Sequence, residues 1–186
     1  MQINIRTNFP DVSRQLSRLQ GDMADKVLAR SLNRTMDIAK TAMSREIRSE
    51  FNLSAAYVRD RLRIKRAFAR AGQFSISAEL AAGDGKKGRS ANVIAFGARP
   101  APGGVSVLIR KGKRKVIKGA FIGNKGRTVF RRVGKSRLPI ESVQTIEIKQ
   151  MFNTRRINAA VVAAMNARFP SIFDRELAYA LSQVGM

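Results

Sequence analysis

The sequence predicts an α+β fold with long N-terminal amphipathic helices, a central, mostly antiparallel sheet and C-terminal helices. Residues 1–70 carry apolar side chains at three- and four-residue steps, the period of an amphipathic helix. Residues 71–140 change to alternating apolar and polar side chains, which is typical of half-buried strands. Residues 141–186 return to helical spacing. Helices and strands separated along the chain in this order favour α+β, and the length of 186 residues suits a single domain, 1–186.

The first region predicts two helices. Asn52-Leu53-Ser54 ends the first of them, and Ser54 is placed to cap a second helix from Ala55 to about Phe68. The apolar stripe of the first helix consists of Val12, Leu16, Leu19, Met23, Val27, Leu28, Leu32, Met36, Ala39, Met43 and Ile47.

The central region predicts a set of short strands around glycine-rich turns. The glycines and lysines of residues 83–92 indicate a flexible loop, and Pro100 to Gly104 indicate a turn. We expect Pro139 to end the sheet. The predicted strands are Phe74–Leu80, Val93–Phe96, Val105–Ile109, Val116–Ile117, Ala120–Ile122 and Thr128–Val133.

The last region predicts a helix from Met151 to Arg168, interrupted by Pro170. Ser171 and Asp174 have the spacing of a capping box, which predicts a new helix to the C-terminus. Its apolar face consists of Phe173, Leu177, Ala180, Leu181 and Val184.

Charge is the most unusual property of the composition. The chain has 36 Lys and Arg against 13 Asp and Glu, a net charge of +23. Residues 85–140 contain no acidic residue, so we expect this segment to contact an anionic partner, either a nucleic-acid backbone or an acidic protein. The candidate contacts are Lys111, Lys113, Arg114, Lys115, Lys118, Lys125, Arg127, Arg131, Arg132, Lys135 and Arg137.

Several kinds of chemistry are disfavoured by the residues present. The chain has no Cys and no His, which excludes Cys/His zinc sites and His-based catalysis. Gly83-x-Gly85-x-x-Gly88 has the letters of a dinucleotide motif, but a strand-like run follows it where a helix is required. Gly134-Lys135-Ser136 lacks the first glycine of a phosphate-binding loop. Glu46 and Glu50 are interpreted as a solvated helix face, and we therefore expect no enzyme, cofactor or bound metal.

No membrane segment is predicted. The longest apolar run, Ala159 to Met165, is far shorter than the roughly 20 residues that cross a bilayer. The residues from Met1 to Arg6 lack the apolar stretch of a signal peptide, so we expect synthesis in the cytoplasm.

Three stretches of the sequence form a set that can be compared with known families. The most specific is Gly119-Ala120-Phe121-Ile122 followed by Gly126-Arg127 and by Arg132-Val133-Gly134-Lys135-x-Arg137-x-Pro139-Ile140. The other two are Leu32-Asn33-Arg34-Thr35, with Arg61 to Ala67 after it, and Glu176 to Leu181. In this order the stretches resemble the minor tail protein Z family of tailed bacteriophages and prophages, over roughly residues 28–182.

The resemblance implies a structural virion protein that completes the tail at its head-proximal end and so permits head–tail joining. It also implies contacts with other tail or neck proteins and a homo-oligomeric ring, with a hexamer favoured over a trimer. It carries no active site or cofactor to this chain. Non-specific contact with phage DNA, or a nucleic-acid-binding protein that uses residues 85–137, stays open as the alternative.

Overall fold

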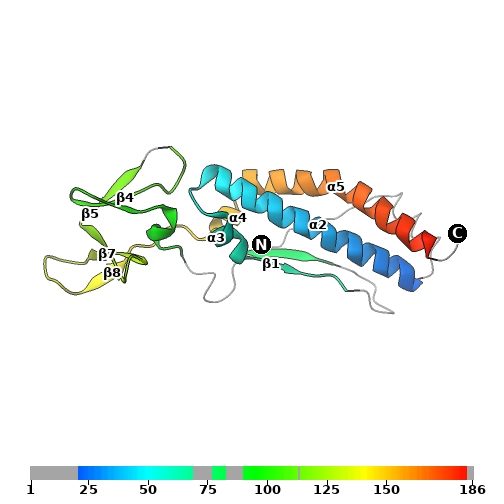
Figure 1. Ribbon diagram of the computed structural model, residues 1–186, viewed down its shortest axis with the longest axis horizontal. Coiled ribbons are helices and arrows are strands. Elements are labelled where there is room, and N and C mark those ends of the chain that lie inside the picture. The colour runs from blue at the N-terminus through cyan, green and yellow to red at the C-terminus, as the bar shows by residue number, and fades with distance from the viewer. Residues whose placement is uncertain (1–20, 69–76, 83–89, 113, 184–186) are drawn as a thin grey trace. The chain divides into compact units, whose positions relative to one another are not determined.

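Helices dominate one part of the chain and antiparallel strands another, which confirms the predicted α+β class (Figure 1). The computed structural model describes residues 21–68, 77–82, 90–112 and 114–183. The chain divides into two compact units built from discontinuous segments. Unit 1 lies within residues 1–43, 62–81 and 158–186, and unit 2 comprises residues 44–61 and 82–157.

Unit 1 is built around two long helices, α2 (Gly21–Glu50) and α5 (Arg155–Ser182), which contribute their residues up to Met43 and from Asn158. Val27 and Leu32 of α2 pack in one buried cluster with Phe169 and Phe173 of α5. The predicted apolar stripe is confirmed from Met23 to Ile47, since every described member is buried or half-buried. Val12, Leu16 and Leu19 lie outside the described residues.

Two polar side chains lie fully buried on the same helix. Ser31 Oγ donates to the carbonyl of Val27 and Thr35 Oγ1 donates to the carbonyl of Ser31, each at 2.8 Å. These bonds to the preceding turn satisfy the hydroxyl donors, so burial leaves no unpaired hydrogen.

The predicted second helix is confirmed at its start and wrong at its end. Ser54 caps α3 (Ala55–Asp60) through its hydroxyl, which accepts from the Tyr57 N–H at 3.2 Å. The chain then forms strand β1 (Leu62–Lys65), which pairs with β2 (Glu79–Ala82).

Alternating burial and a side-chain anchor explain why the chain is extended after residue 61. Leu62 is buried while Arg63 is exposed. Asn33 Oδ1 accepts from the Ala67 N–H at 2.8 Å, and Asn33 Nδ2 donates to the Ala67 carbonyl at 2.9 Å. Of the predicted strand Phe74–Leu80, residues 77 and 78 are not in a strand, Glu79 and Leu80 are, and the rest lies outside the described residues.

Unit 2 contains two three-stranded antiparallel sheets. The first has the order β3 (Arg99–Ala101), β4 (Gly104–Val107), β5 (Lys115–Lys118). The second has the order β6 (Ala120–Gly123), β7 (Thr128–Arg132), β8 (Ile140–Ser142). Val105 and Val107 of the first sheet share a buried cluster with Ala120 and Val129 of the second.

Two expectations for this region are wrong. Val93–Phe96 is not a strand but a 3₁₀-helix, η2, because Asn92 caps its start and Gly97 ends it in the left-handed conformation at φ 65°. Pro139 does not end the sheet, since β8 begins at the next residue and pairs with β7.

The C-terminal helices also differ from prediction. A short α4 (Ile148–Phe152) precedes α5, and α5 continues through Pro170 instead of breaking there. Phe169, Ile172 and Phe173 are buried around the proline, so apolar packing outweighs the one backbone hydrogen bond that proline cannot donate. Ser171 donates to the Arg168 carbonyl at 3.0 Å and caps no new helix. None of the described helices has the length and apolarity needed to traverse a bilayer.

Candidate functional site

The predicted basic contacts lie in the strand-rich unit 2, where every described one is exposed. Lys115 and Lys118 belong to β5, and Arg131 and Arg132 belong to β7. Lys125 and Arg127 lie between β6 and β7, Lys135 and Arg137 lie between β7 and β8, and Lys111 and Arg114 precede β5. Lys113 lies outside the described residues.

Arg114 differs from the other predicted contacts because its guanidinium is already used within the fold. It donates to the Gly97 carbonyl at 2.5 Å, to Ser106 Oγ at 3.0 Å and to the Ser106 carbonyl at 3.2 Å. This side chain therefore joins β4 to the end of η2. None of the other predicted contacts that the structure describes forms an ion pair with a described residue.

The β6–β7 hairpin presents Lys125 at a tight turn. Asn124 and Lys125 both have φ 52°, a left-handed backbone conformation that residues other than glycine rarely adopt. The Gly126 N–H donates to the Gly123 carbonyl and the Arg127 N–H donates to the Asn124 carbonyl, both at 3.1 Å. Strained backbone of this kind is concentrated at functional positions in proteins.

One side of the β6–β7–β8 sheet forms what we call the aromatic face, consisting of Phe121, Phe130, Arg132 and Ile140. Phe121 lies opposite Phe130, and Arg132 lies opposite Ile140, so strand alternation puts all four on one side. The two rings have their centroids 6.0 Å apart, and the Arg132 guanidinium lies 5.7 Å from the centre of the Phe121 ring.

Gly123 makes room for this arrangement. A Cβ at position 123 would lie 3.0 Å from Cδ2 of Phe130, so a larger residue would displace the ring. Both rings are half-buried and Ile140 is 38% exposed. The opposite side of β7 places Val129 in the buried core.

An exposed loop between β7 and β8 follows the aromatic face along the chain. Val133 and Leu138 are 57% and 66% exposed, and Lys135 and Arg137 between them are exposed as well. Exposed apolar side chains rimmed by charged residues are typical of protein interaction sites. This combination suits a partner with an apolar centre and an acidic rim.

The carboxylates considered for catalysis have ion-pair partners. Glu46 Oε2 lies 3.1 Å from Arg156, and Glu50 lies 3.3 Å from Arg156 and 3.5 Å from Arg110. Within the described ranges there is no group of three or more His, Cys, Asp and Glu residues that could hold a metal ion. The Gly83–Gly88 motif lies outside the described residues, and Gly134-Lys135-Ser136 joins two strands with no helix after it.

Comparison with protein families decides the assignment. The family model for prophage minor tail protein Z (GPZ) matches residues 11–184. The chain belongs to the prophage minor tail protein Z family. Neither a curated protein nor a solved structure matches the chain.

Membership in the minor tail protein Z family gives the protein a structural role in a phage tail. It also implies contacts with other phage proteins and a place in the virion. The most specific family-like stretch overlaps the aromatic face, since it contains Phe121 of β6, Arg132 of β7 and Ile140 of β8.

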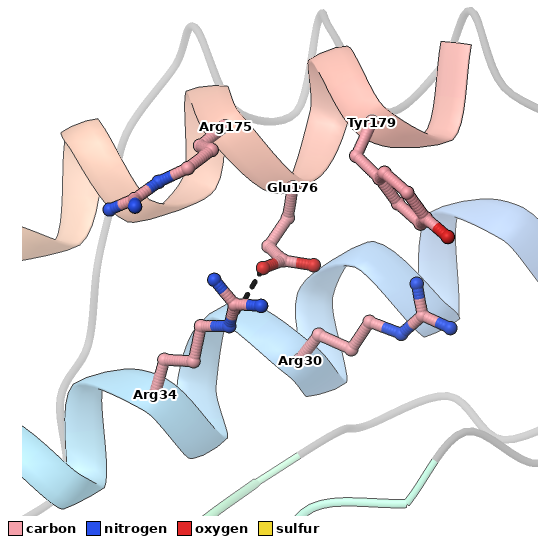
Figure 2. Close-up of a pocket in the computed structure, with 5 residues that line it drawn as sticks. All are labelled: Arg30, Arg34, Arg175, Glu176 and Tyr179. Carbon is pink, nitrogen blue, oxygen red and sulfur yellow. Dashed lines mark ion pairs between the residues drawn. The ribbon is translucent and has the colours of Figure 1, made fainter. Parts of the chain in front are cut away.

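The two flanking family-like stretches meet in unit 1. Arg34 of α2 and Glu176 of α5 form an ion pair at 2.8 Å, and the Glu176 side chain is only 5% exposed (Figure 2). Residues far apart in the sequence thus share one contact between the helices.

Sequence reasoning missed two groups of residues. It did not select Phe130 or Leu138, although the alternation along Thr128–Val133 puts Phe130 and Arg132 on one side. It also missed the grouping of Arg30 with Tyr179, because these two residues come together only when α2 and α5 are paired.

Proposed function

We propose that this member of the minor tail protein Z family completes the phage tail at its head-proximal end and enables head–tail joining. It acts by protein contacts, as a homo-oligomer with a hexamer favoured over a trimer, and is not an enzyme. The carrying observation is the aromatic face with its exposed loop, which combines apolar side chains with uncompensated cations. Family membership supports the setting in a tail.

The aromatic face favours a protein partner over nucleic acid. Binding to a DNA backbone relies on cations and leaves exposed Leu138 and Val133 without a role. Base stacking needs an accessible ring, whereas Phe121 and Phe130 are half-buried and lie against one another, with 32° between their planes. An acidic protein surface would match both the apolar and the charged side chains.

The same charges argue against self-contact through this face. A two-fold contact would bring Arg132, Lys135 and Arg137 against their equivalents, and like charges that face each other are unfavourable. In a ring, the same cations would instead face another surface of a copy whose net charge is +23. We therefore place the contacts of the homo-oligomer elsewhere and assign the aromatic face to a different virion protein. The single-domain organisation of residues 1–186 is part of this proposal, because neither unit is encoded by a continuous stretch of chain.

A complementation experiment tests this function. A prophage with its copy of the gene disrupted would be supplied with the wild-type protein or the variant Phe121→Ala/Arg132→Gln, and particles would be counted by negative-stain electron microscopy. We expect the variant to reduce joined virions by at least about tenfold, since central interface residues commonly contribute 2 kcal/mol or more. Filled heads and separate tails should accumulate.

The matched control is Val116→Ala/Arg99→Gln, which removes an exposed apolar group from β5 and an exposed charge from β3. It should complement like wild type. Normal joining with the Phe121→Ala/Arg132→Gln variant would exclude the aromatic face. Normal joining without any copy of the protein would exclude tail completion itself.

A further inference from the structure

Unit 1 contains a basic pocket between α2 and α5, with a volume of about 340 Å³. Its lining residues are Arg30 and Arg34 from α2 and Arg175, Glu176 and Tyr179 from α5 (Figure 2). The lining thus contains three guanidinium groups and one carboxylate, an excess of positive charge.

Glu176 holds one of the arginines in place. Its side chain is 5% exposed, and its Oε1 lies 2.8 Å from Nε of Arg34, whose side chain is 56% exposed. A buried carboxylate with one fixed guanidinium is an oriented pair (Figure 2).

The other two arginines are not neutralised within the described chain. Arg30 lies 5.7 Å from the centre of the Tyr179 ring, and neither Arg30 nor Arg175 forms a hydrogen bond or ion pair with a described residue. Figure 2 shows Arg30 beside Tyr179 and Arg175 on the other side of Glu176. Their donors are therefore available on both sides of the fixed pair.

We propose that this pocket binds a carboxylate side chain from an acidic segment of another virion protein. Planar guanidinium groups bind carboxylates through two parallel hydrogen bonds, and the Tyr179 ring, 53% exposed, offers an apolar wall for the methylenes of a Glu side chain. The site lies in unit 1 and uses none of the residues of the aromatic face, so it stands independently of head–tail joining.

A single carboxylate fits this pocket better than a nucleic-acid backbone. Duplex DNA presents a charge about every 1.7 Å along its axis and is bound by extended tracks of cations. Here the Glu176 carboxylate forms part of the lining, and Asp174 lies next to Arg175 in the sequence. Both would repel the closely spaced phosphates of a duplex backbone, whereas a single carboxylate can bind at Arg30 beside Tyr179, on the other side of Glu176 from Arg175 (Figure 2).

The tyrosine content provides a local readout. The chain has two tyrosines and no tryptophan, so Tyr57→Phe leaves Tyr179 as the one source of tyrosine fluorescence. Phenylalanine keeps the ring over which Arg61 lies at 3.5 Å. The full chain with Tyr57→Phe would be titrated with a hexaglutamate peptide, and Tyr179 fluorescence would be recorded.

We expect a saturable change in Tyr179 fluorescence, and Arg30→Gln/Arg175→Gln should weaken the affinity at least about tenfold because charge-assisted bonds are lost. Lys118→Gln/Lys125→Gln removes the same charge from unit 2 and should leave the Tyr179 titration unchanged. Arg30→Lys/Arg175→Lys keeps the charge but loses the forked geometry and should weaken binding partially. Circular dichroism would confirm that each variant is folded.

Three results would overturn the proposal. The first is a Tyr179 response that does not saturate. The second is an equal loss of affinity for hexaglutamate in the unit 1 and unit 2 double variants. The third is tighter binding of duplex DNA than of hexaglutamate, with the affinity for DNA lost in Arg30→Gln/Arg175→Gln. The third result would identify phosphate as the ligand.

Discussion

Single side chains connect elements that hydrophobic patterns alone leave unconnected. Asn92 Oδ1 accepts from the Ile94 N–H at 3.1 Å and from the Val129 N–H at 3.0 Å, while Asn92 Nδ2 donates to the Val129 carbonyl at 3.1 Å. One amide thus caps η2 and fixes it to β7. Arg114 performs a similar role at Gly97 and Ser106, so not every cation of the basic segment is available to a partner.

At the same scale, Gly104 is required by the close approach of β4 and β5. A Cβ at this position would lie 2.1 Å from the carbonyl oxygen of Ile117, which is backbone and cannot rotate away. We expect Gly104→Ala to lower the free energy of unfolding by about 2 kcal/mol or more. Urea denaturation followed by circular dichroism would measure the change.

Gly134→Ala provides the matched control, because nothing lies within 4 Å of a Cβ there and the glycine is not in the left-handed region. Its effect should stay within about 0.5 kcal/mol. Equal stabilities for the two variants would contradict the strand approach at Gly104.

Among the elements, the long helix α2 was predictable, whereas η2, β1 and the bounds of the other helices were not. The stripe from Met23 to Ile47 recurs with the helical period over many turns, so local pattern and burial agree. Val93–Phe96 has β-branched and aromatic residues but forms η2, since the Asn92 cap and Gly97 outweigh strand propensity. The extended chain that contains β1 is anchored by hydrogen bonds between the Asn33 side chain and the Ala67 backbone, which the sequence around residue 62 does not reveal.

Helix α5 contains a proline that its packing tolerates. Pro170 is exposed, so its ring contributes little to the core, and it cannot donate the hydrogen bond that other residues donate within a helix. We expect Pro170→Ala to raise the free energy of unfolding by about 1–3 kcal/mol, since proline is about 3 kcal/mol less favourable than alanine inside helices. Urea denaturation would again supply the value.

Ala167→Gly, at another exposed position of α5, should change stability in the opposite direction, by about 1 kcal/mol. If Pro170→Ala lowers stability instead, the proline fits its local backbone and adds rigidity that the unfolded chain lacks. That result would contradict the argument that burial of Phe169 and Phe173 compensates for the hydrogen bond that Pro170 cannot donate.

At the scale of the whole molecule, the sequence predicted which segment carries the cations but not which side chains share a surface. The acid-free stretch 85–140 predicts where cations gather, and the described ones are exposed. The aromatic face depends on the register of β6, β7 and β8, and the basic pocket depends on which helix faces take Arg30 and Arg175 together. Both are tertiary properties, and short-range periodicity contains no information about them.

The net charge of +23 should make stability depend on salt in a particular direction. Like charges in unit 2 repel each other in the folded state, and salt reduces this repulsion over a Debye length of about 10 Å at 0.1 M. We expect the Tm, measured by circular dichroism, to rise by several degrees between about 20 mM and 500 mM NaCl, as a gain of about 1–2 kcal/mol would produce.

Lys135→Gln/Arg137→Gln removes two exposed cations that have no ion-pair partner among the described residues and should reduce the salt dependence of the Tm. Arg156→Gln removes a cation paired with Glu46 and Glu50, so it should lower the Tm at low salt instead. A Tm that falls with added NaCl would show that ion pairs, not repulsion, dominate the electrostatics of the folded chain.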